Sequence, residues 1–225
     1  MWRGMNKAEN VIFFNGEKDS SICASFENDQ CMVSTPKGEF ELRLPLPGRH
    51  NVDNALAATA VCLALDISLD DICKGLQTVK SVPGRLNLVQ ALSGWTVIDD
   101  TYNANPASLY AALQVLSTQV GEPWLVLGDM KELGSDSRKI HAEMGDAAST
   151  LGVKKLFALG EASAATVDAF GDDAAHFDHM DDLIKALREQ LRPGVACLVK
   201  GSRSMGMEQV VRAISNGSEY LEVNG

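Results

Sequence analysis

A polar segment of the chain, DDTYNANP, combines the side chains that a nucleotide site requires. It holds Asp99 and Asp100, then Tyr102, Asn103 and Asn105. A carboxylate in such a segment can accept hydrogen bonds from ribose hydroxyls, or can bind Mg²⁺, which prefers hard oxygen ligands. Asp and Asn also form ordinary turns. The density of acids and amides favours a binding function over a plain turn.

Two further segments carry charge. Lys200, Ser202 and Arg203 lie on a glycine-containing loop before an expected helix, where free backbone N–H groups and the helix dipole favour an anion. A plain glycine turn is the alternative, but a basic loop in an acidic chain favours the anion site. The segment LGDMKELG contains Asp129, for which substrate contact and a surface turn are equally good interpretations.

Three residues near the middle of the chain complete the candidates. Arg85 follows a Pro-Gly pair, where a fixed guanidinium could bind phosphate bidentately, although a lone arginine more often forms an ion pair. Asn51 and Asn54 stand at the entry of an apolar helix. Their amides carry the donor and acceptor that an adenine edge requires. Asn51 or Asp53 could instead only cap that helix.

Composition limits the classes of protein to consider. The chain has 225 residues, 45% of them hydrophobic, which suits one large or two small globular domains. A formal net charge of −10 argues against nucleic acid or an anionic membrane as partner. Without an apolar leader or a membrane-length apolar run, the chain is predicted to be cytoplasmic. Its 5 cysteines lack C-x-x-C spacing, so neither disulfides nor a metal site is predicted.

The first part of the chain reads as a small sheet followed by two helices. Short strands are predicted at 11–14, 22–26, 31–34 and 39–44, separated by turn residues as in an antiparallel meander. An alanine-rich helix is predicted over 53–65, and a second one after Ser68 as its N-cap. Pro83 and Gly84 mark the predicted domain boundary.

The remainder alternates strands and helices. A hairpin should pair 86–92 with 95–99, and Asn105 should cap the helix that Pro106 opens. The other predicted strands are 124–128, 155–160, 174–178 and 196–201, and the predicted helices are 106–119, 137–151, 162–170, 181–191 and 205–215. This order predicts an α/β, doubly wound, mostly parallel sheet of about five or six strands with helices on both faces. Ligands bind beyond the carboxyl ends of such strands, where the polar segments fall.

Taken together, LPLPGRHNVDNALAA, VPGRLN, VIDDTYNANPASL, LGDMKELG and VKGSRSMGMEQV resemble the Mur ligase family of ATP-dependent amide-bond ligases. The resemblance runs in order from Pro45 to Ile214. It implies that residues 1–84 are the last part of a central ATP-binding domain and that 85–225 form a C-terminal Rossmann-like ligase domain. No Gly-Lys pair, hence no P-loop, occurs in the sequence. The chain is therefore expected to be inactive alone.

The resemblance also implies a reaction and a set of ligands. The motifs resemble those of family members that use ATP and Mg²⁺ to join D-alanyl-D-alanine to UDP-N-acetylmuramoyl-tripeptide through an acyl phosphate. The resemblance also implies a monomeric enzyme. By motif, Asn51 and Asn54 resemble adenine contacts, Arg85 the phosphate contact and Asp100 the ribose contact. The residues expected near the nucleotide, the dipeptide or the acceptor peptide are Tyr102, Asn103, Asn105, Asp129, Lys200, Ser202 and Arg203. No residue is assigned to a metal or to a catalytic step.

Three alternatives remain open from the sequence. The chain could be a different amide-bond ligase of the same family. It could be a receiver-like phosphoacceptor module, since such modules place an acidic pair after one strand and a lysine after the last, although Glu161 stands where the phosphoacceptor Asp would be. A dinucleotide-binding oxidoreductase is disfavoured, because no G-x-G-x-x-G follows a strand.

Overall fold

The computed structural model describes residues 12–14, 21–27, 30–46, 49–80, 82–91 and 93–215. The chain divides into two compact units after Lys80. The boundary expected from the sequence, after residue 84, lies slightly further along. Of the strand predicted at 11–14, residue 11 lies outside the described residues, and Phe14 forms an isolated parallel bridge to Ile22.

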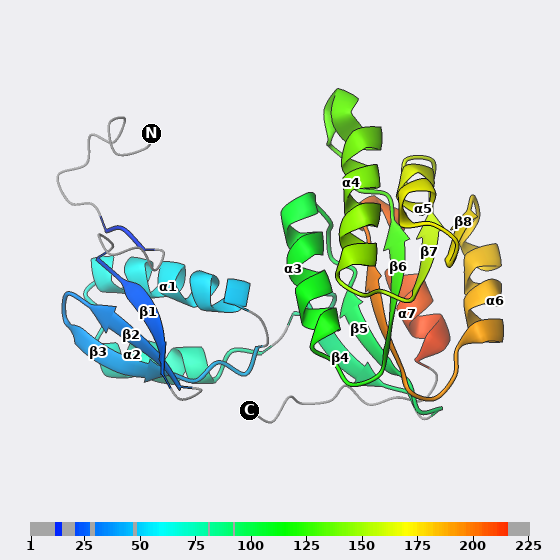
Figure 1. Ribbon diagram of the computed structural model, residues 1–225. Coiled ribbons are helices and arrows are strands. Elements are labelled where there is room, and N and C mark those ends of the chain that lie inside the picture. Colours follow the sequence, from blue (N-terminus) through cyan, green and yellow to red (C-terminus); the bar gives the residue numbers. More distant parts are fainter. Residues whose placement is uncertain are drawn as a thin grey trace. The chain divides into compact units, whose positions relative to one another are not determined.

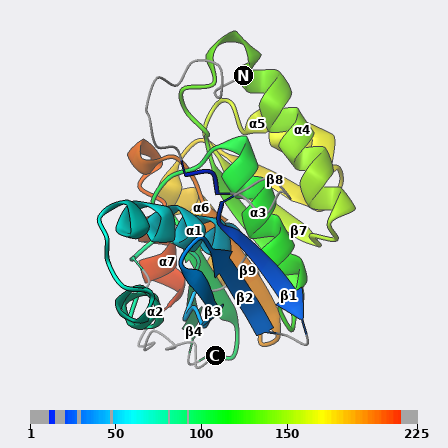
Figure 2. The same ribbon diagram turned by 90° about the vertical axis from the view of Figure 1, so that its left-hand side faces the viewer.

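The N-terminal unit contains three of the four predicted strands as an antiparallel meander, with two helices packed on it (Figure 2). Its elements are β1 (Cys23–Glu27), β2 (Gln30–Thr35), β3 (Gly38–Leu42), α1 (Arg49–Ala64) and α2 (Leu69–Gln77). Val33, Phe40 and Leu56 lie in its apolar core. The N-cap prediction for α2 is confirmed, because the Ser68 side chain accepts a hydrogen bond from the Asp71 N–H at 3.2 Å.

Helix α1 begins earlier than the sequence predicted. Its first residue is Arg49, so Asn51 and Asp53 lie inside the helix, which rules out the alternative that one of them serves only as its cap. The apolar run that predicted the helix starts after its first turn, and the first three residues of the helix are polar. Among the described residues, no helix is long and apolar enough to cross a bilayer.

The C-terminal unit is built on a six-stranded sheet with the order β4-β5-β9-β6-β7-β8. The strands are β4 (Asn87–Gln90), β5 (Thr96–Asp100), β6 (Glu122–Gly128), β7 (Lys155–Leu159), β8 (Ala174–Phe177) and β9 (Val195–Lys200). Only β4 is antiparallel to its neighbour, as the predicted hairpin requires. The predicted mostly parallel α/β sheet is confirmed.

Helices cover both faces of this sheet (Figure 1). They are α3 (Pro106–Ser117), α4 (Ser137–Thr150), α5 (Ala164–Phe170), α6 (Met180–Gln190) and α7 (Glu208–Ile214). Helices α3, α4 and α5 pack against one face, which includes Ile98 and Leu198, whereas α6 and α7 pack against the other, which includes Val97 and Val199. Consecutive residues of a strand therefore belong to separate apolar cores, because their side chains point to opposite faces of the sheet.

Helix α7 starts later than predicted. The residues before it form a short 3-10 helix, Arg203–Met205, and Gly206 then takes a left-handed φ of 62° that interrupts the helical path. The loops after β5, β6 and β9 leave the sheet at its carboxyl edge from three neighbouring strands. The fold therefore brings the three polar segments of the sequence together.

Candidate functional site

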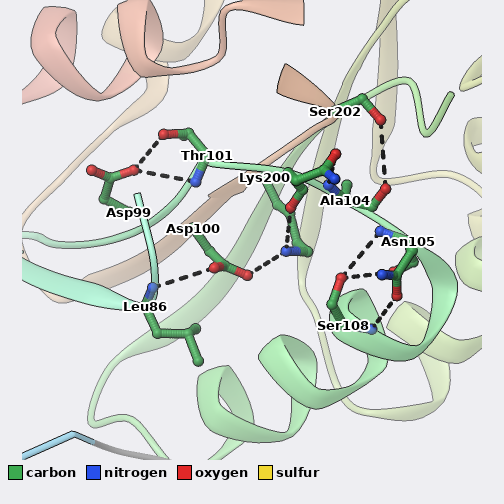
Figure 3. A network of polar contacts seen from close by, with 10 residues as sticks. Leu86, Asp99, Asp100, Thr101, Ala104, Asn105, Ser108, Lys200 and Ser202 are labelled. Atoms are coloured by element: carbon green, nitrogen blue, oxygen red, sulfur yellow. Dashed lines mark hydrogen bonds and ion pairs between the residues drawn. The ribbon is translucent and has the colours of Figure 1, made fainter. Parts of the chain in front are cut away.

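A buried ion pair between Asp100 and Lys200 lies at the centre of the carboxyl edge (Figure 3). The Lys200 Nζ donates to Asp100 Oδ2 at 2.5 Å and to the carbonyl of Asn103 at 2.9 Å. The other carboxylate oxygen, Asp100 Oδ1, accepts from the backbone N–H of Leu86 at 3.3 Å. The two side chains are 2% (Lys200) and 12% (Asp100) exposed. This pair joins β9, the end of β5 and the chain that enters the unit.

The ammonium of Lys200 is buried, an environment that is unfavourable for an isolated charge. Burial lowers the pKa of Lys200, while the Asp100 carboxylate opposes that shift and the nearby Arg85 adds to it. The carboxylate is thus what keeps a cation at a position that is 1% exposed. Lys200 does not reach solvent, unlike the exposed Arg85 and Arg203.

Asp99 shapes the turn after β5. Its Oδ1 accepts from the Thr101 hydroxyl at 2.7 Å and from the Thr101 N–H at 3.3 Å (Figure 3). Burial raises the pKa of Asp99, although these hydrogen bonds oppose the shift. Asp99 also accepts a hydrogen bond from the backbone of Gly84, so the two neighbouring acids differ chiefly in that Asp100, and not Asp99, pairs with a buried lysine.

Arg85 and Tyr102 form a stacked pair next to this acid. The Arg85 guanidinium lies over the Tyr102 ring, 4.4 Å from its centroid, a favourable cation–π arrangement. The Tyr102 N–H donates to the carbonyl of Gly84 at 2.9 Å. Gly84 has a φ of +77°, and a Cβ there would lie 2.8 Å from the Tyr102 nitrogen, so only glycine permits this approach. Backbone and side chain together hold Arg85 on the loop.

The two asparagines of the loop have local partners. Asn105 caps α3: its Oδ1 accepts from the Ser108 N–H at 2.8 Å, and the Ser108 hydroxyl accepts from the Asn105 N–H at 3.1 Å. The predicted cap, with Pro106 at the first helical position, is confirmed. The Oδ1 of Asn103 accepts from the Ala104 N–H at 2.9 Å. Both asparagines are exposed, so they remain available to a ligand.

Ser202 connects the three loops of the edge. Its Oγ accepts from the Lys131 N–H at 2.8 Å and reaches the carbonyl of Ala104 at 3.5 Å, while its N–H donates to the carbonyl of Asp129 at 3.1 Å. It is only 5% exposed. Arg203, the next residue, is exposed and lies 3.5 Å from Glu208.

Asp129 is buried and fully engaged. Its carboxylate accepts from Lys131 Nζ at 2.9 Å and from the Ser163 N–H at 2.8 Å. Burial would raise the pKa of Asp129, but the hydrogen bonds from Lys131 and from the backbone N–H groups of Ser163 and Ala162 lower it below its ordinary value. Asp129 therefore anchors the loop after β6, and Lys131 is the exposed group beside it.

His141 is a supporting residue that sequence reasoning did not identify. It is fully buried on α4, its Nε2 accepts from the Met130 N–H at 3.0 Å, and its Nδ1 lies 2.7 Å from the carbonyl of Ser137. These contacts require the proton on Nδ1. The sequence showed only a histidine on a helix, with no signal for the distant backbone group that it meets.

Asn51 and Asn54 lie in the N-terminal unit. They are one turn apart on α1, and the Asn54 Nδ2 donates to Asn51 Oδ1 at 3.4 Å. Their amides thus share one side of the helix. Among the described residues of either unit, no three His, Cys, Asp or Glu side chains are grouped as a metal site requires.

Comparison with known families covers both units. The description "Mur ligase, glutamate ligase domain" matches residues 84–203, more than half of the chain, and "Mur ligase middle domain" matches residues 2–62. The two matches contain the motifs LPLPGRHNVDNALAA, VIDDTYNANPASL and LGDMKELG in full, and VPGRLN and VKGSRSMGMEQV in part.

Individual relatives agree with the family match. The chain is 39% identical over 221 residues to the UDP-N-acetylmuramoyl-tripeptide–D-alanyl-D-alanine ligase of Escherichia coli (strain K12), covering 97% of this chain and 48% of that protein. It is 35% identical over 224 residues to the Haemophilus influenzae enzyme of the same name, covering 96% of this chain and 49% of that protein. The chain thus spans about half the length of these curated relatives.

A solved structure has a fold similar to that of this chain. The UDP-N-acetylmuramoylalanyl-D-glutamyl-2,6-diaminopimelate–D-alanyl-D-alanyl ligase from Acinetobacter baumannii is 33% identical, with a TM-score of 0.78 over 90% of this chain and 45% of that one. The family description matches more than half of this chain, and sequence, fold and motif order agree with it. The chain belongs to the Mur ligase family.

Proposed function

We propose that this chain provides the C-terminal part of an ATP-dependent ligase that joins D-alanyl-D-alanine to UDP-N-acetylmuramoyl-tripeptide. In that reaction the tripeptide carboxylate attacks the terminal phosphorus of ATP, giving an acyl phosphate and ADP. The amine of D-alanyl-D-alanine then attacks the acyl carbon, and phosphate leaves. Two relatives with this named activity, at 39% and 35% identity, support the proposal.

The observation that carries the proposal is the arrangement of Arg85, Tyr102 and Asp100. An exposed guanidinium, held by stacking, lies one residue from the Leu86 N–H that binds the Asp100 carboxylate. A guanidinium suits phosphate and a carboxylate suits ribose hydroxyls. Each Asp100 oxygen has one partner and can accept a second hydrogen bond. This supports a role for Asp100 and Arg85 in holding the nucleotide.

The exposed groups around this pair suit the other substrates. Asn103, Asn105, Lys131 and Arg203 surround the carboxyl edge and reach solvent. We assign them to the dipeptide or the acceptor peptide, whose amide and carboxylate groups they can bind. Asp129 and Ser202 are buried beneath them and hold the loops that carry them. We assign Asn51 and Asn54 to the adenine.

Mg²⁺ enters this proposal only as the counter-ion of ATP. The described residues contain no cluster of three candidate ligands, and the carboxylate of Asp129 already accepts from Lys131 and Ser163. The residues present therefore do not fit a resident metal, and no step is assigned to one. Catalysis by this part of the protein would rest on positioning and charge neutralisation. We further propose that the enzyme is monomeric and cytoplasmic.

A chimera tests the proposed activity. The chain would replace the matching half of the Escherichia coli relative, and phosphate release would be measured with ATP, Mg²⁺, UDP-N-acetylmuramoyl-tripeptide and D-alanyl-D-alanine. We expect turnover that depends on D-alanyl-D-alanine in the chimera and none in the chain alone. Asp100→Asn should raise the KM for ATP, while the surface change Lys139→Met should not.

The substrate pattern of the chimera separates the alternatives. Turnover with another amino acid or dipeptide, but not with D-alanyl-D-alanine, would place the chain in a different ligase of the family. Substantial turnover by the chain alone would show that the expectation of inactivity was wrong. No observation in the structure favours a receiver-like module or an oxidoreductase over a member of the Mur ligase family.

A further inference from the structure

Lys200 differs from the other cations of the site in where it lies. It ends strand β9 and is 1% exposed, whereas Arg85 and Arg203 lie on exposed loops. Its Nζ is 2.5 Å from Asp100 Oδ2 and 2.9 Å from the carbonyl of Asn103. Two of the three ammonium N–H groups thus have acceptors, and the burial of the side chain leaves a ligand phosphate or carboxylate no open approach to the third. Direct ligand contact, the role suggested by the resemblance, therefore does not suit the geometry.

The strand register explains why Lys200 meets Asp100. The two residues are direct partners in the parallel pairing of β5 and β9. Directly paired residues of neighbouring strands point to the same face of a sheet, so the pairing follows from the backbone. Both positions belong to the rigid sheet, whereas Tyr102 and Asn103 belong to the loop.

We propose that Lys200 is a positioning residue that acts on the nucleotide only through Asp100. It fixes the rotation of the Asp100 carboxylate and, through the Asn103 carbonyl, the start of the loop. The carboxylate oxygens then offer their remaining lone pairs to the ribose hydroxyls in one orientation. This inference rests on the proposed function, in which Asp100 accepts hydrogen bonds from the ribose.

Burial of this charge supports such a role. A buried ion pair is often no more stabilising than apolar side chains of the same size, because both ions lose their hydration. Burial lowers the pKa of Lys200, because the ammonium loses its hydration at this position. A Met and a Leu would fill the same space without that cost. The ionic pair supplies what apolar side chains lack, which is a carboxylate held in one orientation.

The test compares ADP with dideoxy-ADP, which lacks both ribose hydroxyls. Dissociation constants for the 225-residue chain would be measured by NMR titration, with spectral dispersion as the check on folding. Since a hydrogen bond to a charged group changes affinity by about tenfold, the unchanged chain should prefer ADP by about that factor. Lys200→Met should weaken ADP binding and leave dideoxy-ADP binding unchanged. Lys155 is the first residue of β7 and so lies at the amino end of the parallel strands, away from the carboxyl edge. Lys155→Met should therefore change neither dissociation constant.

A second pair of variants covers a failure of Lys200→Met to fold. Asp100→Asn should abolish the preference for ADP, and adding Lys200→Met to it should alter neither dissociation constant. A direct phosphate contact by Lys200 predicts that both nucleotides weaken equally in Lys200→Met, and again in the double variant. Either result would overturn the inference.

Failure of the proposed function has its own signature. If the unchanged chain binds ADP and dideoxy-ADP equally, Asp100 does not contact the ribose, and the inference falls with that assignment. If the unchanged chain binds neither nucleotide, the proposed nucleotide site itself is refuted. A retained preference for ADP in Lys200→Met refutes only the positioning role.

Discussion

Replacing His141 tests how the loop after β6 is held. His141 is fully buried, and its Nε2 accepts from the backbone N–H of Met130, which is itself 1% exposed. In His141→Leu the side-chain volume is nearly kept but the Met130 N–H loses its acceptor. An unsatisfied buried donor costs about 1–3 kcal/mol. We expect the free energy of unfolding of the C-terminal unit to fall by that amount.

His141→Gln is the matched control, because its Oε1 can take the place of Nε2 as the acceptor. Leu and Gln have similar helix propensities, so α4 itself should respond alike to both. Urea unfolding followed by tryptophan fluorescence would report on Trp95 and Trp124 in this unit, and hydrogen exchange would report on the Met130 amide. The result that would contradict this prediction is a free energy of unfolding within about 0.5 kcal/mol of the parent for both variants, which is the usual range for neutral changes. The hydrogen bond would then contribute nothing measurable to stability.

Three further predictions address neighbouring features. Gly160→Ala should destabilise the protein more than Gly152→Ala in urea unfolding: both glycines have positive φ, but a Cβ at 160 would lie 2.6 Å from the Asp129 carboxylate and one at 152 meets nothing. Because the pKa of Asp129 is lowered in the folded state, its ionised form stabilises the fold above about pH 4, and this contribution is lost as the pH falls further. Asp129→Asn should therefore flatten the dependence of the urea midpoint on pH in that acid range, and an unchanged slope would contradict the assignment. Tyr102→Leu should weaken ADP binding by roughly two- to fivefold through loss of the cation–π contact, whereas Tyr102→Phe should retain it, as titration would show.

Local signals predicted most of the fold. The caps of α2 and α3 were visible because Ser68 and Asn105 act on backbone groups within three residues. The alternation of short apolar runs with helical segments predicted the parallel sheet. The starts of α1 and α7 were misplaced because a polar first turn at Arg49 and a glycine at 206 carry no apolar periodicity.

The site was predictable as a set of segments but not as a set of contacts. The carboxyl edge brings the three polar loops together, and that followed from the fold class. Two contacts depend on how loops and a helix pack across the sheet. They are the hydrogen bonds from the Lys131 N–H to Ser202 and from the Met130 N–H to His141. Leu86 adopts a left-handed φ of 53°, which a sequence gives no reason to expect of a leucine.

The two neighbouring acids show what strand register adds to a sequence motif. Val97 lies in the core beneath α6 and α7, and Ile98 lies in the core beneath α3 to α5. Alternation then directs Asp99 and Asp100 toward opposite faces, as Figure 3 shows. Leu198 shares the core of Ile98, so Lys200 must share the face of Asp100. The sequence contains this alternation, but only the pairing of β5 with β9 indicates which acid the lysine meets. Asp100 thereby pairs with Lys200, whereas Asp99 accepts hydrogen bonds from Thr101 and from the backbone of Gly84.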